Sequence, residues 1–307
     1  MKKISVVIPM YYEEEMVNTC YKELKMVLSK LKNYDYEMIF VNDGSLDKTL
    51  PLLTKIAKSD KDVKIISLSR NFGHQAAVSA GLKYVTGVVI LIIDADLQDP
   101  PKVIPDMLKL WEDGYEVIYG KRKLRKGESF FKLFTAKMYY KILNHLSTVN
   151  IPKDTGDFRL VDRKVVDVIN SMPEHNRFLR GMFSFTGFKQ IAFLYERDKR
   201  YAGKTKYTLK KMLRLSSDGI IGFSYKPLDL LITISITFFL IAVALLILIF
   251  VFPKHYLVFL ISCLFAFSTS IITFSMWILS LYIRRIYDEV RNRPTYIIDK
   301  TINIKKS

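Results

Sequence analysis

Two aspartates two positions apart, Asp94 and Asp96, are the side chains whose types and spacing most clearly suggest chemistry. They follow the apolar run VVILII (88–93), and Gln98 has the same parity, so on an extended chain the three side chains share one face. Hard oxygen ligands of this kind suit Mg²⁺ or Mn²⁺, which typically binds one or two carboxylates together with substrate phosphates. The pair predicts a divalent-cation site ahead of the rigid Pro-Pro at 100–101, and a solvated turn is the alternative.

The apolar runs that precede polar clusters predict the strands of one sheet. Four such runs are expected to be strands, with a further short one at 117–119: 4–8, 37–41, 63–68 and 88–93. Charged, helix-compatible segments separate them: 13–31, 48–57 and 75–84. Strands that are apolar throughout and alternate with helices indicate a mostly parallel sheet covered on both faces, an α/β fold. Loops after the carboxyl ends of such strands carry the ligand, so one crevice is expected.

Two long uncharged stretches predict a transmembrane hairpin. Residues 230–252 and 256–283 contain 23 and 28 residues without a charge. At a rise of about 1.5 Å per residue, the shorter stretch spans roughly 35 Å, enough to cross a bilayer. Two helices buried in a soluble domain are the alternative. Basic residues flank the hairpin while its loop holds a single lysine, so the positive-inside rule places both flanks in the cytoplasm; the flanking residues are Lys226, Arg284, Arg285, Arg291 and Arg293.

The expected organisation is therefore a cytoplasmic domain, a multi-pass anchor in the cell membrane and a cytoplasmic tail. The segments are a domain over 1–225, a hairpin over 226–284 with spans at about 228–252 and 256–283, and a tail over 285–307. Half of the residues are apolar, which excludes a chain disordered throughout. Cys20 and Cys263 lie far apart, so neither a disulfide framework nor a cysteine metal cluster is expected.

Positive charge is concentrated in the middle of the chain. The formal net charge is +17, and residues 117–226 hold 24 basic and 9 acidic side chains. Because this segment precedes a membrane hairpin, anionic headgroups or a phosphorylated lipid explain the charge better than nucleic acid does. Within it, about 130–146 and 204–222 interleave basic with apolar residues, which predicts amphipathic helices at the bilayer interface. Ordinary surface helices are the alternative.

Taken together, the sequence resembles the family 2 glycosyltransferases with a GT-A, Rossmann-like fold. The resemblance is strongest to polyprenyl-phosphate sugar transferases, namely dolichol-phosphate mannose synthases and, more closely, bactoprenol glucosyltransferases. It extends from residue 4 to about residue 285, and the stretches that carry it are IPMYYEEE, VNDGS, SRNFGHQAA, DADLQDPP, GDFRL, NRFLRG, ERDKRYAGKTKY and the hairpin.

The resemblance implies roles for individual residues. The residues implied to bind the nucleotide sugar are Pro9, Tyr11, Glu13, Asp43, Asp94 and Asp96, with Asp43 bonded to the base. The implied ligands of Mg²⁺ or Mn²⁺ are Asp94, Asp96 and Gln98. Asp157 in GDFRL matches the acidic residue proposed as catalytic. The implied cations for phosphate groups are Arg122, Lys132, Arg200 and Lys206.

A lipid phosphate acceptor changes the role of Asp157. A phosphomonoester near pH 7 is largely dianionic because its second pKa is about 6, so cations that hold it matter more than a base. Asp157 is expected to act either as a base or as a stabiliser of positive charge at the anomeric carbon, and pairing with Arg159 is its structural alternative. For Glu13 the alternative is a carboxylate in the first turn of a helix.

Two positions depart from the family pattern. The family's first loop usually reads Tyr-Asn-Glu or Phe-Asn-Glu, and this chain has Tyr12 at the asparagine position. Asn42 replaces the first aspartate of the common Asp-Asp-Gly-Ser, a change that is frequent in the bactoprenol branch. The first departure affects the hydrogen bonding expected around Tyr12.

The expected activity is an inverting transfer of a hexose from a nucleotide sugar to undecaprenyl or another polyprenyl phosphate at the cytoplasmic membrane face. UDP-glucose is the expected donor, and GDP-mannose or UDP-N-acetylglucosamine are the alternatives. A catalytically silent membrane adaptor is the alternative from a different class. Membrane lipids are expected partners, nucleic acid is not, and a homo-oligomer is compatible with the hairpin.

Overall fold

The computed structural model describes residues 1–122, 152, 155–175, 177–196 and 256–304. Its strands are β1 Lys2–Met10, β2 Tyr34–Asn42, β3 Val63–Leu68, β4 Val89–Ile92, β5 Val117–Arg122, β6 Thr155–Asp162, β7 Gln190–Tyr195 and β8 Ile298–Ile302. Its helices are α1 Val17–Leu28, α2 Thr49–Ser59, α3 His74–Lys83, α4 Ile104–Glu112, α6 Arg163–Ser171, α7 Leu179–Phe185 and α10 Tyr256–Arg291, with a 3₁₀ turn at Pro101–Val103. The expected strands and the helices between them are confirmed, with shifted ends.

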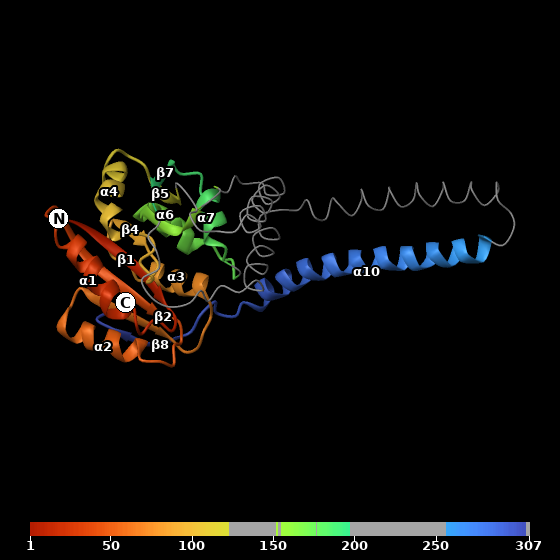
Figure 1. Cartoon of the computed structure of the whole chain (residues 1–307), viewed down its shortest axis with the longest axis horizontal. Coiled ribbons are helices and arrows are strands. Elements are labelled where there is room, and N and C mark those ends of the chain that lie inside the picture. Colours follow the sequence, from red (N-terminus) through yellow and green to blue (C-terminus); the bar gives the residue numbers. More distant parts are fainter. Residues whose placement is uncertain (123–151, 153–154, 176, 197–255, 305–307) are drawn as a thin grey trace.

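The strands form a single mixed sheet in the order β7-β5-β6-β4-β1-β2-β3-β8 (Figure 1). The pairs β1–β2, β1–β4, β2–β3 and β5–β7 are parallel. The pairs β4–β6, β5–β6 and β3–β8 are antiparallel. The expected α/β, mostly parallel sheet is thus confirmed, and β6 and β8 are the strands that run against it.

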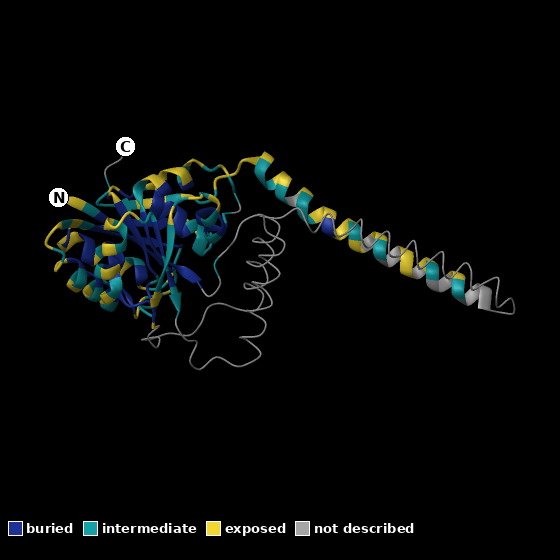
Figure 2. Cartoon of the chain, turned by 90° about the horizontal axis from the view of Figure 1, so that it is seen from above, coloured by how far each residue is buried: buried dark blue, intermediate teal, exposed yellow. Residues whose placement is uncertain are grey.

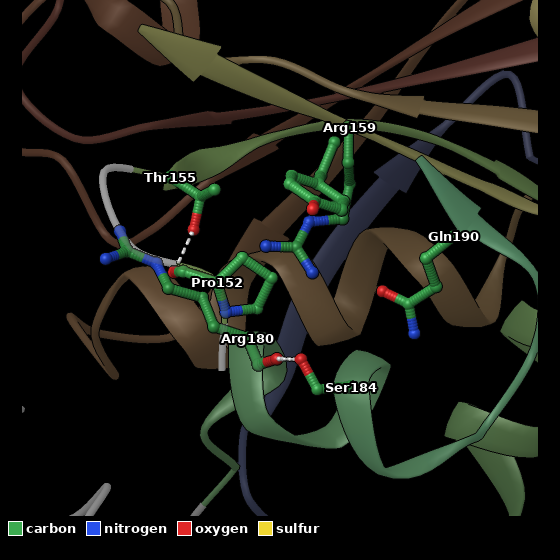
Figure 3. Close-up of a pocket in the computed structure, with 7 residues that line it drawn as sticks. Pro152, Thr155, Arg159, Arg180, Ser184 and Gln190 are labelled. Atoms are coloured by element: carbon green, nitrogen blue, oxygen red, sulfur yellow. Dashed lines mark hydrogen bonds between the residues drawn. The ribbon is translucent and has the colours of Figure 1, made fainter. Parts of the chain in front are cut away.

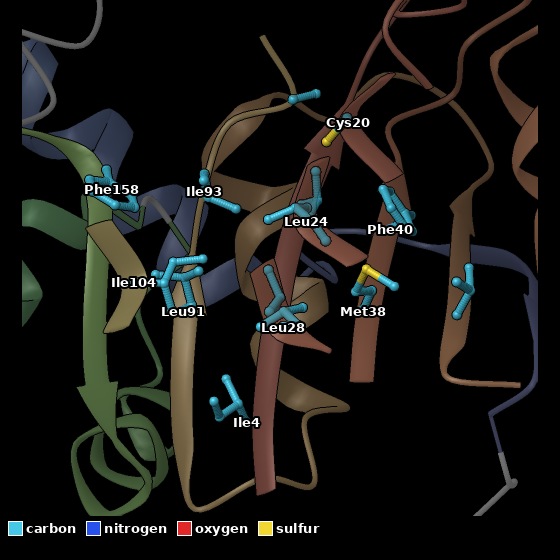
Figure 4. Packing of buried hydrophobic residues seen from close by; sticks show 14 of the residues in the cluster. Ile4, Cys20, Leu24, Leu28, Met38, Phe40, Leu91, Ile93, Ile104 and Phe158 are labelled. Atoms are coloured by element: carbon cyan, nitrogen blue, oxygen red, sulfur yellow. The ribbon is translucent and has the colours of Figure 1, made fainter. Parts of the chain in front are cut away.

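Both faces of the sheet are buried, which explains why its central strands are apolar throughout. On one face, Ile4 and Met38 pack with Leu24 and Leu28 of α1 (Figure 4). On the other face, Val7 and the strand residues beside it pack with α3, α6 and α7. Figure 2 shows the buried residues concentrated in the sheet between these two helical layers. Because helices cover both faces of the sheet, polar loops lie at the ends of its strands.

The carboxyl ends of the parallel strands lie together at one end of the sheet, and we call this end the functional edge. β1 to β4 end there because they are parallel to one another. β5 ends there because β4 and β5 both pair antiparallel with β6, and β7 ends there because it is parallel to β5. Because β6 runs antiparallel to β4 and β5, it contributes its amino end, which contains Asp157. Residues distant in sequence therefore meet at this edge.

The C-terminal segment returns to the domain as a strand that sequence analysis did not predict. β8 pairs antiparallel with β3, with Ile302 opposite Ile65. Asn303 follows it with a φ of +58°, and its side-chain amide donates to the carbonyl oxygens of Ala57 and Val63 at 2.7 and 2.8 Å. Part of the expected tail over 285–307 is therefore fixed to the edge of the sheet.

Helix α10 covers the second uncharged stretch and continues to Arg291. It extends away from the domain (Figure 1), and Figure 2 shows many of its residues exposed. Its exposed large apolar side chains include Ile261, Phe265, Ile272, Phe274, Met276, Trp277 and Ile283. Within the described residues, no helix is found that is long and apolar enough to cross a membrane. The first expected span at 228–252 and the expected interface helices at 130–146 and 204–222 lie outside those residues.

Candidate active site

Asp157 lies at the functional edge in a set of charged and polar contacts. Arg180 of α7 donates through Nε to its Oδ1 at 2.8 Å and through a terminal nitrogen to its Oδ2 at 3.2 Å. The Gln75 amide lies 3.5 Å from Oδ2, and Nε2 of His74 lies 3.1 Å from it. Burial alone would raise the pKa of Asp157, but Arg180 and His74 outweigh burial and hold its pKa well below the usual range. Asp157 is therefore a fixed carboxylate anion.

This geometry excludes the alternative in which Asp157 is paired with Arg159, because its carboxylate pairs with Arg180 and His74. The Arg159 guanidinium donates to backbone oxygens, those of Asp157 at 3.3 Å and Gly156 at 3.1 Å, and stacks on Phe183 at 4.4 Å. Figure 3 shows Arg159 in the small pocket between the start of β6, β7 and α7, well apart from the Arg180 guanidinium. Arg159 and Asp157 lie on the same face of β6 and both contact α7, the carboxylate through Arg180 and the guanidinium through Phe183.

His74 links Asp157 to the expected metal-binding pair. It is the first residue of α3, and its Nε2 lies 3.8 Å from Asp94 Oδ1 as well as 3.1 Å from Asp157. Its side chain is 27% exposed, yet the Nε2 atom itself is shielded from solvent. Burial would lower the pKa of His74, but the two carboxylates raise its pKa to about 9. A cationic imidazole therefore stands between two acidic groups.

Asp94 and Asp96 follow β4 at the functional edge, as the sequence predicts. Burial, and after it the nearby carboxylates of Asp99, Asp157 and Asp96, raise the pKa of Asp94 to about 6, against a lowering effect of His74. Asp96 accepts a hydrogen bond from the backbone of Gln98 at 3.2 Å. In the part of the chain that the structure describes, no three His, Cys, Asp or Glu side chains are grouped as a metal site. Two crowded carboxylates nevertheless suit a divalent cation whose remaining ligands are substrate phosphates and water.

Asp43, at the end of β2, orders the loop that leads into α3. Its carboxylate accepts hydrogen bonds from the side chain of Asn71 at 2.8 Å, the backbone of Phe72 at 2.7 Å and the backbone of Gly73 at 2.9 Å. Gly73 has a φ of +98°, which side-chain-bearing residues rarely adopt. Asp43 thus places His74, a role that sequence analysis did not assign to it.

The first-strand loop lies beside Asp43. Pro9 is buried in β1, and Tyr11 packs edge to face on Tyr12 with ring centroids 4.6 Å apart. Tyr12 has a φ of +54°, and its backbone N–H donates to Ser45 Oγ at 3.0 Å. Asparagine is among the residues that tolerate this left-handed conformation best, which explains the family's preference at this position. The backbone N–H of Glu13 donates to Thr49 Oγ1 at 3.0 Å, so Glu13 links this loop to the start of α2.

Of the four expected phosphate-binding cations, the structure describes one. Arg122 ends β5 at the functional edge, and its Nε is buried without a hydrogen-bond partner among the described residues. Lys132, Arg200 and Lys206 lie outside the described residues. His74, Gln75 and Arg180 belong to motifs that carry the resemblance, SRNFGHQAA and NRFLRG, but nothing in their spacing connects them to Asp157.

Comparison with known proteins decides the family. A family model described as glycosyl transferase family 2 matches residues 5–169, more than half of the chain. The chain belongs to this family. Its sheet has the GT-A-like arrangement, for which a nucleotide-sugar donor is typical, and the protein is a glycosyltransferase.

Relatives of the family 2 enzyme match it over nearly the full length. The protein of Bacillus subtilis (strain 168) named uncharacterized glycosyltransferase YkcC is 46% identical and covers 98% of this chain and 94% of its own length. The SfII prophage-derived bactoprenol glucosyl transferase of Shigella flexneri is 39% identical and covers 97% of this chain and 98% of its own. The solved structure of Mycobacterium tuberculosis glucosyl-3-phosphoglycerate synthase with Mn²⁺ and UDP-glucose is 18% identical, with a TM-score of 0.47. The match covers 72% of this chain and 78% of that one.

Proposed function

We propose that the protein transfers a hexose, glucose from UDP-glucose, to undecaprenyl or another polyprenyl phosphate at the cytoplasmic face of the membrane, with inversion at the anomeric carbon. The names of relatives such as the Shigella flexneri bactoprenol glucosyl transferase support both the sugar and the acceptor. In this reaction an acceptor phosphate oxygen forms a bond to the anomeric carbon. The bond from that carbon to the donor diphosphate breaks, and the nucleoside diphosphate leaves.

The observation that carries the proposal is the state of Asp157. A sugar hydroxyl must lose a proton to become a nucleophile, so an enzyme that glycosylates one needs a base whose pKa lies near the working pH. Asp157 is bonded to Arg180 and lies beside a cationic His74, and its pKa is held well below the usual range. Such a carboxylate is a poor base. It suits a phosphate acceptor, which already carries its negative charge.

Asp157 then acts as an electrostatic stabiliser. Its carboxylate would stabilise the positive charge that develops at the anomeric carbon as the donor bond lengthens, and Arg180 keeps the carboxylate oriented. Arg122 would hold the acceptor phosphate, together with Lys132, Arg200 and Lys206. These cations would offset the repulsion between the acceptor and the donor diphosphate.

The donor would lie over the loops after β1, β2 and β4. Pro9, Tyr11 and Glu13 would surround the nucleoside, and Asp43 would contact the base in addition to ordering the loop before α3. Asp94, Asp96 and Gln98 would hold Mg²⁺ or Mn²⁺, which when bound supplies neutralisation of the diphosphate charge.

Anchoring in the membrane would bring the domain to its acceptor, because a polyprenyl tail keeps the phosphate at headgroup level. We propose a hairpin with spans at about 228–252 and 256–283 and the domain and both termini in the cytoplasm. The absence of charges from residues 230–252 and 256–283 and the exposed apolar side chains of α10 support it.

The test is a donor panel with the purified full-length protein. UDP-glucose, GDP-mannose and UDP-N-acetylglucosamine are each incubated with undecaprenyl phosphate and Mg²⁺ or Mn²⁺, and the lipid product is analysed by mass spectrometry. Formation of glucosyl-phosphoryl-undecaprenol from UDP-glucose is expected. Product from another donor would correct the sugar alone. No product from any donor, in a protein that still binds vesicles, would favour the silent adaptor.

A further inference from the structure

Tyr195 lies beside Arg122 at the functional edge. The two residues end neighbouring parallel strands, β7 and β5, and are register partners in the sheet. Residues in register on adjacent strands point to the same face and lie about 5 Å apart. The Tyr195 hydroxyl is accordingly within hydrogen-bonding reach of the Arg122 side chain.

The same hydroxyl also contacts the loop that carries Asp94 and Asp96. It donates a short hydrogen bond to Oδ1 of Asp99, and Tyr195 and Asp99 are only 3% and 2% exposed. Burial, followed by the charge of Asp99, raises the pKa of Tyr195, so the phenol keeps its proton and remains the donor. The Tyr195 hydroxyl therefore connects the loop after β4 to the side chain of Arg122 at the end of β5.

Packing fixes the ring of Tyr195. It meets Phe158 edge to face, with ring centroids 5.5 Å apart. Gly120 lies under both rings, and a Cβ atom there would be 2.6 Å from Phe158 Cδ1 and 2.9 Å from Tyr195 Cε1. With the ring held by these contacts, the position of the hydroxyl is determined by the fold, and it can serve as a fixed reference for both of its partners.

We infer that Tyr195 and Asp99 are positioning residues that tie Arg122 to the loop of Asp94 and Asp96, and so set the distance between the acceptor phosphate and the donor diphosphate. The inference rests on the proposed role of Arg122 in binding the acceptor. Two phosphate groups that repel each other must be held at one separation for the acceptor oxygen to reach the anomeric carbon. A buried carboxylate and phenol orient the Arg122 guanidinium without contacting either substrate.

The test compares Tyr195→Phe with a matched control, Tyr21→Phe. Tyr21 also donates through its hydroxyl to an aspartate, Asp60, at 2.8 Å, but it lies on α1 and not at the functional edge. Binding of farnesyl phosphate and of UDP-glucose with Mn²⁺ is measured by calorimetry on the full chain in nonionic detergent. We expect Tyr195→Phe to raise the Kd of farnesyl phosphate about tenfold, the typical effect of losing a hydrogen bond that involves a charged group. The Kd of UDP-glucose should stay within twofold, and Tyr21→Phe should change neither value.

A double-mutant cycle separates positioning of Arg122 from a general structural role. If Tyr195 acts through Arg122, Tyr195→Phe should have no further effect on farnesyl phosphate binding in an Arg122→Ala background. Additive losses, an unchanged farnesyl phosphate Kd in Tyr195→Phe, or wild-type binding no tighter than that of farnesol would each overturn the inference. If the binding data follow expectation while wild-type protein transfers no sugar, the inference stands and the proposed function fails.

Discussion

Replacing Arg180 by glutamine should impair catalysis through Asp157. The guanidinium supplies two hydrogen bonds to the buried carboxylate, at 2.8 and 3.2 Å. Hydrogen bonds to charged groups contribute about 1.5 to 3 kcal/mol each, and His74 and Gln75 remain in place. Because the glutamine amide can still donate one hydrogen bond, we expect the net loss of one such bond, about 1.5 to 3 kcal/mol of transition-state stabilisation or roughly 10- to 150-fold in kcat/KM.

The pH dependence of the transfer rate tests whether Arg180→Gln acts through Asp157. Without Arg180 the pKa of Asp157 rises, because burial then acts against a weaker set of cations. The acid limb of the rate profile should consequently move to higher pH, while Arg180→Lys should restore part of the rate. Sugar transfer to undecaprenyl phosphate is followed between pH 5 and pH 9, with thermal unfolding recorded for each variant.

Arg163→Gln is the matched control, because the Arg163 guanidinium donates to the backbone carbonyl oxygens of Val85 and Gly87 and not to Asp157. It should lower the unfolding temperature and leave the rate of folded protein unchanged. If Arg180→Gln retained kcat/KM within twofold of wild type with an unshifted acid limb, the assignment of Asp157 as a clamped anion would be refuted.

Substitutions at three further sites test the metal pair, the C-terminal strand and the buried charge cluster. Asp96→Ala should abolish Mg²⁺- or Mn²⁺-dependent turnover at an unchanged unfolding temperature; full activity would remove the metal assignment. Asn303→Ala should cost about 2 kcal/mol in thermal unfolding, because two hydrogen bonds at 2.7 and 2.8 Å are lost and alanine disfavours a φ of +58°. Asn303→Gly should lower the free energy of unfolding by less, because glycine tolerates that φ. Equal losses of stability in the two variants would argue against backbone strain. Glu37 is 1% exposed, and burial alone would raise its pKa. Its hydrogen bonds outweigh burial and lower the pKa from 4.5 to about 2; the partners are Lys64, Ser5, Lys3 and Thr86. Glu37→Gln should therefore lower the free energy of unfolding by about 3 kcal/mol at pH 7. That difference should disappear as the pH falls from about 4.5 to about 2, and a pH-independent difference would contradict the ion-pair origin.

The central strands could be predicted because both of their faces are buried. A run such as VVILII has no polar position and is bounded by turn residues, so its state is readable from sequence. β6 and β8 were not predicted because both contain charged residues, which are buried in β6 and lie at the edge of the sheet in β8. β6 buries Asp157 and Arg159 and so lacks an apolar signature, while β8 is an edge strand whose IDKTI sequence includes charged residues.

The candidate site was predictable where chemistry and strand ends coincide. Asp94 and Asp96 follow a strand directly, so their place at the functional edge followed from the expected topology. The pairing of Asp157 with Arg180 could not be predicted, since Asp157 lies on β6 and Arg180 lies 23 residues away on α7, and only the fold brings them together. Likewise, the left-handed backbone of Tyr12, which explains the family's asparagine, is a property of the folded loop.

The decisive experiment is to identify the product formed from radiolabelled UDP-glucose and undecaprenyl phosphate by wild-type protein and by Asp157→Asn in parallel. We expect β-linked glucosyl phosphoryl lipid from the α-linked donor, and a slow Asp157→Asn enzyme whose rate is not rescued by raising the pH. Label transferred with retained configuration would contradict it, as would label found only on a hydroxyl-bearing acceptor or an Asp157→Asn enzyme as fast as wild type.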